Sequence, residues 1–159
     1  MGASPLPIFP NVRTLPDPAA TEALAAEIAP LLSPGDVIAL SGDLGAGKTV
    51  FARALIRALA AAAGREIVDV PSPTFTLVQL YELPAFTVYH FDLYRLAAPD
   101  EAWEIGIEEA FAEGVSVIEW AERIESLLPG DCIRIALAFG DGETARIARL
   151  ERGEPPHDR

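Results

Sequence analysis

The sequence predicts an α/β fold, and three features of the chain support this prediction. The apolar run 37–40 has the length of a buried strand, and a glycine-rich segment and helical spacing over 50–63 follow it directly. Further apolar runs of strand length alternate with helical patterns later in the chain. Finally, the runs 132–139 and 144–150 flank a Gly-Asp-Gly-Glu turn, which is typical of an antiparallel hairpin.

The N-terminal part predicts an arm, an edge strand and a helix. Three prolines within residues 1–10 indicate a flexible arm. Residues 12–15 have the composition of a short edge strand. Asp17 is a favourable N-cap residue and Pro18 suits the first helical position, so we expect a helix from there to about Leu32.

The segment 42–49 follows the first apolar strand and matches the pattern G-x-x-x-x-G-K-S/T in full. Glycine lets backbone N–H groups approach a phosphate closely, and the N-terminus of the following helix favours negative charge. Lys48, the only lysine in the chain, can reach the β- and γ-phosphates, and the Thr49 hydroxyl can bind Mg²⁺. The helix ending near Leu32 either packs on this unit or also walls the site of the base. The predicted nucleotide-binding residues are Gly42, Asp43, Leu44, Gly45, Ala46, Gly47, Lys48 and Thr49.

A stiff segment separates the helix after this loop from the next strands. Residues 67–70 and 76–81 each predict a short strand. Between them, two prolines spaced by one residue can neither continue a helix nor lie inside a sheet. The segment is either a simple turn or a switch-like loop in which a hydroxyl meets Mg²⁺ or the γ-phosphate. Thr74 is the candidate for that role, and Ser72 is the second choice.

Two predicted strands end in a carboxylate. Asp92 lies at the end of the strand predicted over 86–93, and Glu119 ends the strand predicted over 115–119. The carboxyl end of a strand is where α/β nucleotide-binding proteins place a ligand of Mg²⁺. Asp92 is therefore a candidate metal ligand or a turn residue, and Glu119 either binds Mg²⁺ or orients the attacking water. We interpret His90 as a packed or hydrogen-bonded histidine rather than a metal ligand.

Composition restricts the domain organisation and the kind of partner. The 159 residues favour a single domain over residues 11–151, followed by a disordered tail at 152–159. The 24 acidic and 12 basic residues give a net charge of −12, which argues against direct binding to nucleic acid. The acidic helical segment 101–113, with a break at Gly106, is either a solvated surface or a docking surface for a basic partner. A short helix is expected over 121–128.

Several protein classes do not fit the sequence. No apolar run approaches the ~18 residues of a membrane span, and the N-terminus does not have the pattern of a signal peptide, so we expect a cytoplasmic protein without membrane partners. Cys132 is the single cysteine and is expected to be a core thiol. The N-K-x-D motif of guanine-specific GTPases cannot exist here, because Lys48 is the only lysine. A small-molecule kinase stays open, although an acidic segment stands where such enzymes usually carry an arginine-rich lid.

Four stretches form a specific combination, namely residues 42–49, 72–77, 90–96 and 118–120. The first is shared by many phosphate-binding families, but the four together are not. In order and spacing, from about residue 15 to residue 150, they closely resemble the TsaE (YjeE) family. These are small bacterial ATPases required for the threonylcarbamoyladenosine modification of tRNA.

The resemblance implies a three-layer P-loop NTPase fold, in which a mixed sheet has a parallel core and an antiparallel C-terminal hairpin. It also implies that ATP and Mg²⁺ are the cofactors, with Lys48 on the phosphates and Thr49 on the metal. Asp92 would be a Walker-B-like carboxylate, Glu119 would bind Mg²⁺ or position water, and Thr74 would lie in the switch-like loop. The implied catalytic residues are Lys48, Thr74, Asp92 and Glu119, and the implied metal ligands are Thr49, Asp92 and Glu119.

The resemblance further implies partners. In such families the ATPase binds a complex of the TsaD and TsaB proteins, and its ATPase cycle resets that complex, while tRNA is contacted only indirectly. Hydrolysis by the isolated protein is expected to be weak, because the sequence shows no arginine finger and no complete water-positioning site. Two alternatives stay open: a small-molecule kinase, and a docking switch that uses ATP without significant hydrolysis.

Overall fold

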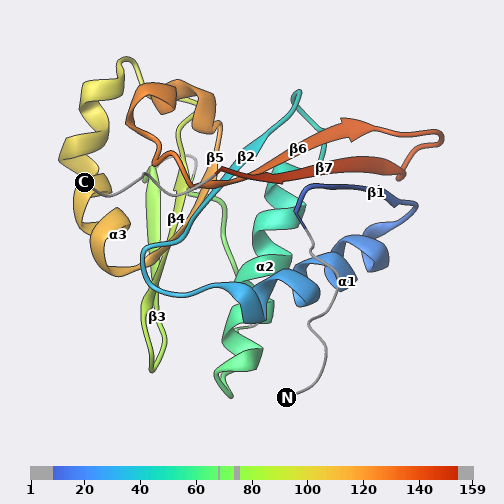
Figure 1. Cartoon of the computed structure of the whole chain (residues 1–159), viewed down its shortest axis with the longest axis horizontal. Coiled ribbons are helices and arrows are strands. Elements are labelled where there is room, and N and C mark those ends of the chain that lie inside the picture. Colours follow the sequence, from blue (N-terminus) through green and yellow to red (C-terminus); the bar gives the residue numbers. More distant parts are fainter. Residues whose placement is uncertain (1–8, 68, 74–75, 154–159) are drawn as a thin grey trace.

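A seven-stranded sheet in the order β1-β7-β6-β2-β5-β4-β3 forms the centre of the molecule (Figure 1). The structure is a computed structural model that describes residues 9–67, 69–73 and 76–153. Within these residues, no helix is both long enough and apolar enough to cross a membrane. The elements are β1 (Asn11–Leu15), α1 (Pro18–Ile28), η1 (Ala29–Leu31), β2 (Val37–Ser41), α2 (Lys48–Ala62), β3 (Val78–Glu82), β4 (Thr87–Asp92), η2 (Pro99–Ile105), α3 (Ile107–Glu113), β5 (Val115–Glu119), η3 (Ala121–Leu127), β6 (Ile133–Phe139) and β7 (Arg146–Arg152).

The sheet is mixed, as predicted. Strands β6, β2, β5 and β4 run parallel to one another and form its centre. The β6–β7 hairpin, β1 and the opposite edge strand β3 are all antiparallel to their neighbours. The parallel core and the antiparallel C-terminal hairpin of the predicted fold are thus confirmed. Because parallel strands share one direction, β2, β4 and β5 end at the same edge of the sheet, where α/β proteins form their sites.

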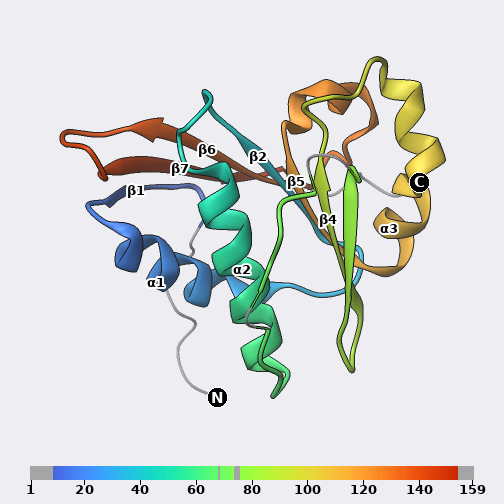
Figure 2. The same cartoon turned by 180° about the vertical axis from the view of Figure 1, so that it is seen from behind.

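Helices cover both faces of the sheet. On one face α1 packs along α2, and their side chains form a core with Leu40, Ile135 and other inward residues of the strands. On the other face η2, α3 and η3 contribute to a second core around Phe91 and Ile118. Figure 2 shows the same arrangement from behind, with α1 and α2 on one side of the strands and α3 on the other. The three layers follow from these two separate cores.

Local sequence signals explain where several elements begin and end. The Asp17 side chain accepts a hydrogen bond from the Ala20 N–H at 2.9 Å, and Pro18 occupies the first turn, so the predicted N-cap is confirmed. β1 lies at the edge of the sheet, as the sequence predicts. The predicted helical segments at 101–105 and 121–128 are 3₁₀ rather than α-helical. Ile124, at φ −128°, interrupts the second of them.

The strand predicted over 67–70 does not form in the described residues 67, 69 and 70. Instead, the Arg53 guanidinium on α2 donates a hydrogen bond to the Val70 carbonyl at 2.9 Å. Pro71 follows and has no N–H to give to a ladder. The apolar side chain of Val70 is buried, but against the α1–α2 side of the core. β7 includes Arg152, where the predicted tail begins.

Replacing Gly114 by alanine is expected to destabilise the fold by about 3 kcal/mol, because the new Cβ has no room between the Tyr89 ring and the Thr87 carbonyl. That atom would lie 2.5 Å from Tyr89 Cε1 and 2.6 Å from the Thr87 carbonyl oxygen. Gly64→Ala is the matched control, since φ is 76° there but no atom lies within 4 Å of the added Cβ. We expect about 1 kcal/mol for that change, from the left-handed backbone alone. Urea unfolding measures both, and equal losses would contradict the steric explanation.

Candidate functional site

The glycine-rich loop 42–47 connects β2 to α2 at the carboxyl edge of the parallel strands. Gly42 has φ 142°, and a Cβ there would lie 2.4 Å from the Leu137 carbonyl oxygen. Gly47, at φ 109°, stands immediately before the first residue of α2. Both positions need glycine, one for close approach and positive φ and the other for positive φ. The loop backbone therefore lies next to the N-terminus of the 15-residue helix α2. This position favours binding of an anion.

Lys48 is the first residue of α2, and its ammonium group is turned back onto the loop. Nζ donates hydrogen bonds to the carbonyl oxygens of Gly42 and Asp43. It also lies 4.0 Å from the centroid of the Trp120 ring, a cation–π contact. Burial lowers the pKa of Lys48, and the charges of Glu122 and Glu119 act in the opposite direction. Two carbonyl oxygens and an aromatic ring, all uncharged, therefore hold the ammonium at the loop. Anionic oxygens can replace the two carbonyl oxygens as its hydrogen-bond acceptors.

Thr49, Glu119 and His90 form a continuous line of contacts from α2 through β5 to β4. The Thr49 hydroxyl donates to Glu119 Oε1 at 2.6 Å, and His90 Nε2 lies 2.7 Å from Glu119 Oε2. His90 is fully buried and Glu119 is 1% exposed. Both oxygens of the carboxylate are therefore engaged, one by each neighbour. His90 is a hydrogen-bonded histidine, as the sequence indicates.

Asp92 lies beside Glu119, because the two residues are register partners at the ends of the parallel strands β4 and β5. Its side chain is 6% exposed. Oδ1 accepts a hydrogen bond from the Tyr94 N–H at 3.1 Å, which fixes the turn after β4. Asp92 therefore has the turn role that the sequence allowed, and its position at the carboxyl edge also matches the alternative role of a metal ligand.

A cavity of about 410 Å³ brings most of the predicted site residues together. Ser72, the second choice in the switch-like segment, borders the cavity, whereas Thr74 lies outside the described residues. The ring centroids of Trp120 and Tyr94 lie 4.9 Å apart, so these two aromatic side chains together form one wall of the cavity. The Trp120 backbone has a positive φ of 60°. The lining residues are Leu44, Gly45, Gly47, Lys48, Thr49, Val50, Ser72, Asp92, Tyr94, Glu119 and Trp120.

The oxygen donors at this cavity suit a cation whose remaining ligands are waters or phosphate oxygens. Thr49 supplies a hydroxyl, and Asp92 and Glu119 supply carboxylates. Within residues 9–67, 69–73 and 76–153, no three His, Cys, Asp or Glu side chains group as a metal cage. Mg²⁺ is usually held by one or two carboxylates, waters and substrate phosphates rather than by an all-protein cage. The donor set therefore fits Mg²⁺ accompanied by a nucleotide.

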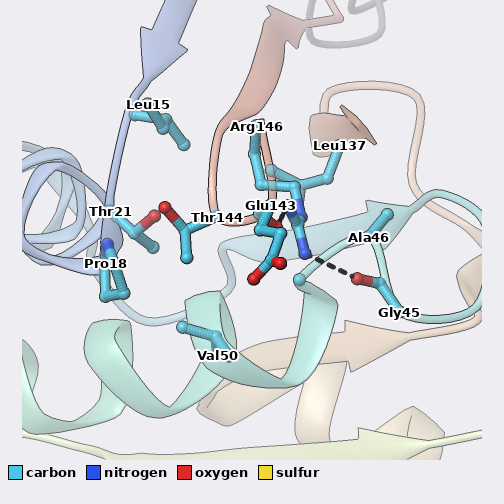
Figure 3. Close-up of a pocket in the computed structure, with 11 residues that line it drawn as sticks. Leu15, Pro18, Thr21, Gly45, Ala46, Val50, Leu137, Glu143, Thr144 and Arg146 are labelled. Atoms are coloured by element: carbon cyan, nitrogen blue, oxygen red, sulfur yellow. Dashed lines mark hydrogen bonds between the residues drawn. The ribbon is translucent and has the colours of Figure 1, made fainter. Parts of the chain in front are cut away.

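A second cavity, of about 160 Å³, adjoins the other side of the loop (Figure 3). Pro18 and Thr21 of α1 border it, so the helix walls a cavity beside the loop in addition to packing on α2. Arg146, from the start of β7, donates a hydrogen bond to the Gly45 carbonyl at 3.2 Å. The lining residues are Leu15, Pro18, Thr21, Gly45, Ala46, Gly47, Val50, Leu137, Glu143, Thr144 and Arg146.

Sequence reasoning missed two contributors to these cavities. Arg146 follows a hairpin turn and resembles any strand arginine in the sequence, because only the β6–β7 pairing brings it to the loop 101 residues earlier. Tyr94 lies within the stretch 90–96, and an aromatic residue two positions after a candidate carboxylate is a signal that the sequence does contain. Arg95, in the same stretch 90–96, does not border either cavity.

Comparison with known proteins places this geometry in a family. A family model described as "Threonylcarbamoyl adenosine biosynthesis protein TsaE" matches residues 15–148. The "tRNA threonylcarbamoyladenosine biosynthesis protein TsaE" of Rickettsia bellii is 42% identical over 123 residues, which cover 77% of this chain and 83% of the relative. The protein of the same name from Bacillus subtilis is 40% identical over 129 residues, covering 80% and 77%.

A solved structure agrees with these sequence matches. The crystal structure of Bacillus subtilis YdiB superimposes with a TM-score of 0.68 at 30% identity, and the match covers 91% of this chain and 86% of that one. The family match at 15–148 includes the loop, both carboxylates and the hairpin arginine. The chain therefore belongs to the TsaE family and takes part in the biosynthesis of threonylcarbamoyladenosine in tRNA.

Proposed function

We propose that this chain binds ATP with Mg²⁺ and hydrolyses the γ-phosphate in support of tRNA threonylcarbamoyladenosine synthesis. One observation carries the proposal: Lys48, Thr49 and the two carboxylates Asp92 and Glu119 border one cavity at a phosphate-type loop. The loop and its helix N-terminus suit phosphate, whereas the carboxylates do not suit an anion without a cation between them. A nucleotide with its metal matches both sets of groups, because its phosphates suit the loop and its cation suits the carboxylates.

The proposed chemistry is in-line attack of water on the γ-phosphorus, which breaks the bond to the β–γ bridging oxygen and releases ADP and inorganic phosphate, with the protons of the water passing to the phosphate and the solvent. Lys48 would leave the carbonyl oxygens of Gly42 and Asp43 and donate to the β- and γ-phosphate oxygens. Bound Mg²⁺ would supply further charge neutralisation on those oxygens. Glu119 would orient the attacking water, and the ring of Trp120 would exclude other water from the site.

The smaller cavity beside the loop supports binding of the base at α1 and the hairpin. Its walls combine apolar side chains, such as Leu15 and Leu137, with the guanidinium of Arg146. A planar cation can stack on an aromatic base. No N-K-x-D segment is present in the chain, so this site favours adenine over guanine recognition.

Arg146→Ala is expected to weaken ATP binding about fivefold, the value of one lost cation–π contact. Binding of tripolyphosphate, which has the charges but no base, is expected to change by less than about twofold. Isothermal titration with the two ligands separates the roles, because Arg146 also donates to the loop at Gly45. An equal loss for both ligands would show that the arginine supports the loop and not the base.

The proposed partners are the TsaD and TsaB proteins, with tRNA contacted only through them. The net charge of −12 disfavours direct contact with tRNA phosphates. An acidic surface over η2 and α3 suits a partner that carries basic residues. Its exposed acidic residues are Asp100, Glu101, Glu104, Glu108, Glu109 and Glu113.

A pull-down with TsaD and TsaB, with and without ATP, followed by a phosphate-release assay, tests the proposal. We expect ATP-dependent capture and hydrolysis that is at least about tenfold faster in the assembly than in the isolated chain, because no arginine is among the described residues that line the larger cavity. Equal rates would contradict the partner-dependent mechanism. Single-turnover hydrolysis in the assembly would exclude a non-hydrolysing docking switch, and a phosphorylated metabolite in place of free phosphate would instead favour a kinase.

A further inference from the structure

His90 is the most deeply buried titratable side chain at the site, and its environment is unusual. The imidazole is fully buried in β4, between Gln79 of β3 and Val117 of β5 in the sheet register. Nε2 lies 2.7 Å from Glu119 Oε2. Among the described residues, no group forms a hydrogen bond with Nδ1. One ring nitrogen is therefore engaged with the carboxylate, and the other is buried without a protein partner.

This arrangement is costly if His90 only fills space. A carboxylate only accepts hydrogen bonds, so Nε2 carries the proton in this contact, an assignment that follows from the contact itself. The unpartnered Nδ1 then loses its hydration without compensation. An apolar side chain of similar size would fill the same volume without that cost. Among the described residues, the contact with Glu119 is the only feature of the ring that requires a histidine-like donor.

We propose that His90 is a positioning residue that aligns Glu119, and through Glu119 the hydroxyl of Thr49, for the nucleotide-bound cation. The His90 Nε2–H fixes Oε2, and this leaves Oε1 to accept the Thr49 proton at 2.6 Å. With its proton directed to Glu119, the Thr49 oxygen presents its lone pairs to a cation. This inference rests on the proposed Mg²⁺–ATP function, and it adds a residue that does not touch the ligand.

Two isosteric amides separate this role from simple packing. In His90→Gln the side-chain N–H reaches the position of Nε2, whereas in His90→Asn it reaches only the position of Nδ1. We expect His90→Gln to keep the Mg²⁺ dependence of ADP binding close to wild type. His90→Asn is expected to raise the half-saturating Mg²⁺ concentration at least about tenfold, the usual effect of losing a partner that orients a metal ligand.

The experiment titrates Mg²⁺ into the protein with a fluorescent ADP analogue and, separately, measures ADP affinity in EDTA. Metal-free ADP affinity should stay within about twofold of wild type in both variants, because the hydrogen bond of His90 goes to Glu119 and His90 is not among the residues that line the cavity. Ser116→Ala is the matched control, since Ser116 is also buried, lies on β5 and has no hydrogen-bond partner for its hydroxyl among the described residues. It should behave as wild type in every titration.

A readout without metal or nucleotide completes the test. In EDTA, urea unfolding of His90→Asn, Glu119→Ala and the double variant should be non-additive, because both changes remove the same contact. Additive losses, or equal Mg²⁺ requirements in the glutamine and asparagine variants, would overturn the inference while leaving the proposed function intact. If ADP binding by the wild-type chain does not respond to Mg²⁺ at all, the proposed function fails, and the inference fails with it.

Discussion

Replacing Lys48 by alanine is expected to lower kcat/KM for ATP hydrolysis by at least about 100-fold, the typical loss when one donor to a developing anionic charge is removed. Lys48 is 5% exposed and lies where the loop meets α2, so its charge is positioned at the proposed phosphate site. Within the described residues, the cavity has no other lysine or arginine in its lining. Phosphate release and ATP titration together measure the effect.

The control for Lys48→Ala is Arg53→Ala. Arg53 is a cation on the same helix, and it donates to the Val70 carbonyl away from the cavity. Its loss should leave kcat/KM within about twofold of wild type. Melting curves without nucleotide must be recorded for both, because Lys48 also satisfies two loop carbonyls. Unchanged ATP affinity and turnover in a folded Lys48→Ala protein would remove the loop from the proposed mechanism.

Asp92→Asn and Glu119→Gln are expected to impair different steps, the first Mg²⁺-dependent ATP binding and the second ATP hydrolysis. Asp92→Asn should weaken Mg²⁺-dependent ATP binding by at least about tenfold, because it removes a charge from the proposed cation site. Glu119→Gln should bind MgATP normally but hydrolyse it about 100- to 1,000-fold more slowly, because the carboxylate that orients water is lost. The glutamine still offers an oxygen to Thr49, and its amide can donate to the other tautomer of His90.

Calorimetry with MgATP and single-turnover hydrolysis distinguish these two losses. If the results are reversed, so that Glu119→Gln loses Mg²⁺-dependent binding while Asp92→Asn binds normally, the two carboxylates exchange roles. That outcome would agree with the other possibility that the sequence left open for Glu119. Normal hydrolysis by both variants would contradict the proposed mechanism.

Elements with strong local signals could be predicted from the sequence alone. β5 forms over the predicted Val115–Glu119, and the Asp17 cap places the start of α1. The segment 67–70 could not be predicted, because its apolar composition suits a strand but the hydrogen bond from Arg53 is a tertiary contact. The same holds for the 3₁₀ form of η2 and η3, which their short helical patterns did not distinguish from α-helix.

The candidate site was partly predictable for a similar reason. The G-x-x-x-x-G-K-S/T motif predicts Lys48 and Thr49 as site residues. The position of Asp92 and Glu119 at the carboxyl ends of predicted strands indicates these two carboxylates. The contacts between them depend on the adjacency of β4, β5 and β2. No spacing in the sequence shows that Glu119 joins Thr49 to a buried histidine, or that the Lys48 ammonium lies over Trp120. The residue types were therefore available from the sequence, whereas their pairing came from the sheet order.

A crystal structure of this chain with Mg²⁺ and a non-hydrolysable ATP analogue tests the central claim most directly. We expect the triphosphate along loop 42–47, with Lys48 Nζ released from the Gly42 and Asp43 carbonyls and within hydrogen-bond distance of phosphate oxygens. Mg²⁺ is expected to contact the Thr49 hydroxyl on the side of Asp92. A nucleotide bound elsewhere, or Lys48 still bonded to its own loop beside an occupied site, would contradict the account.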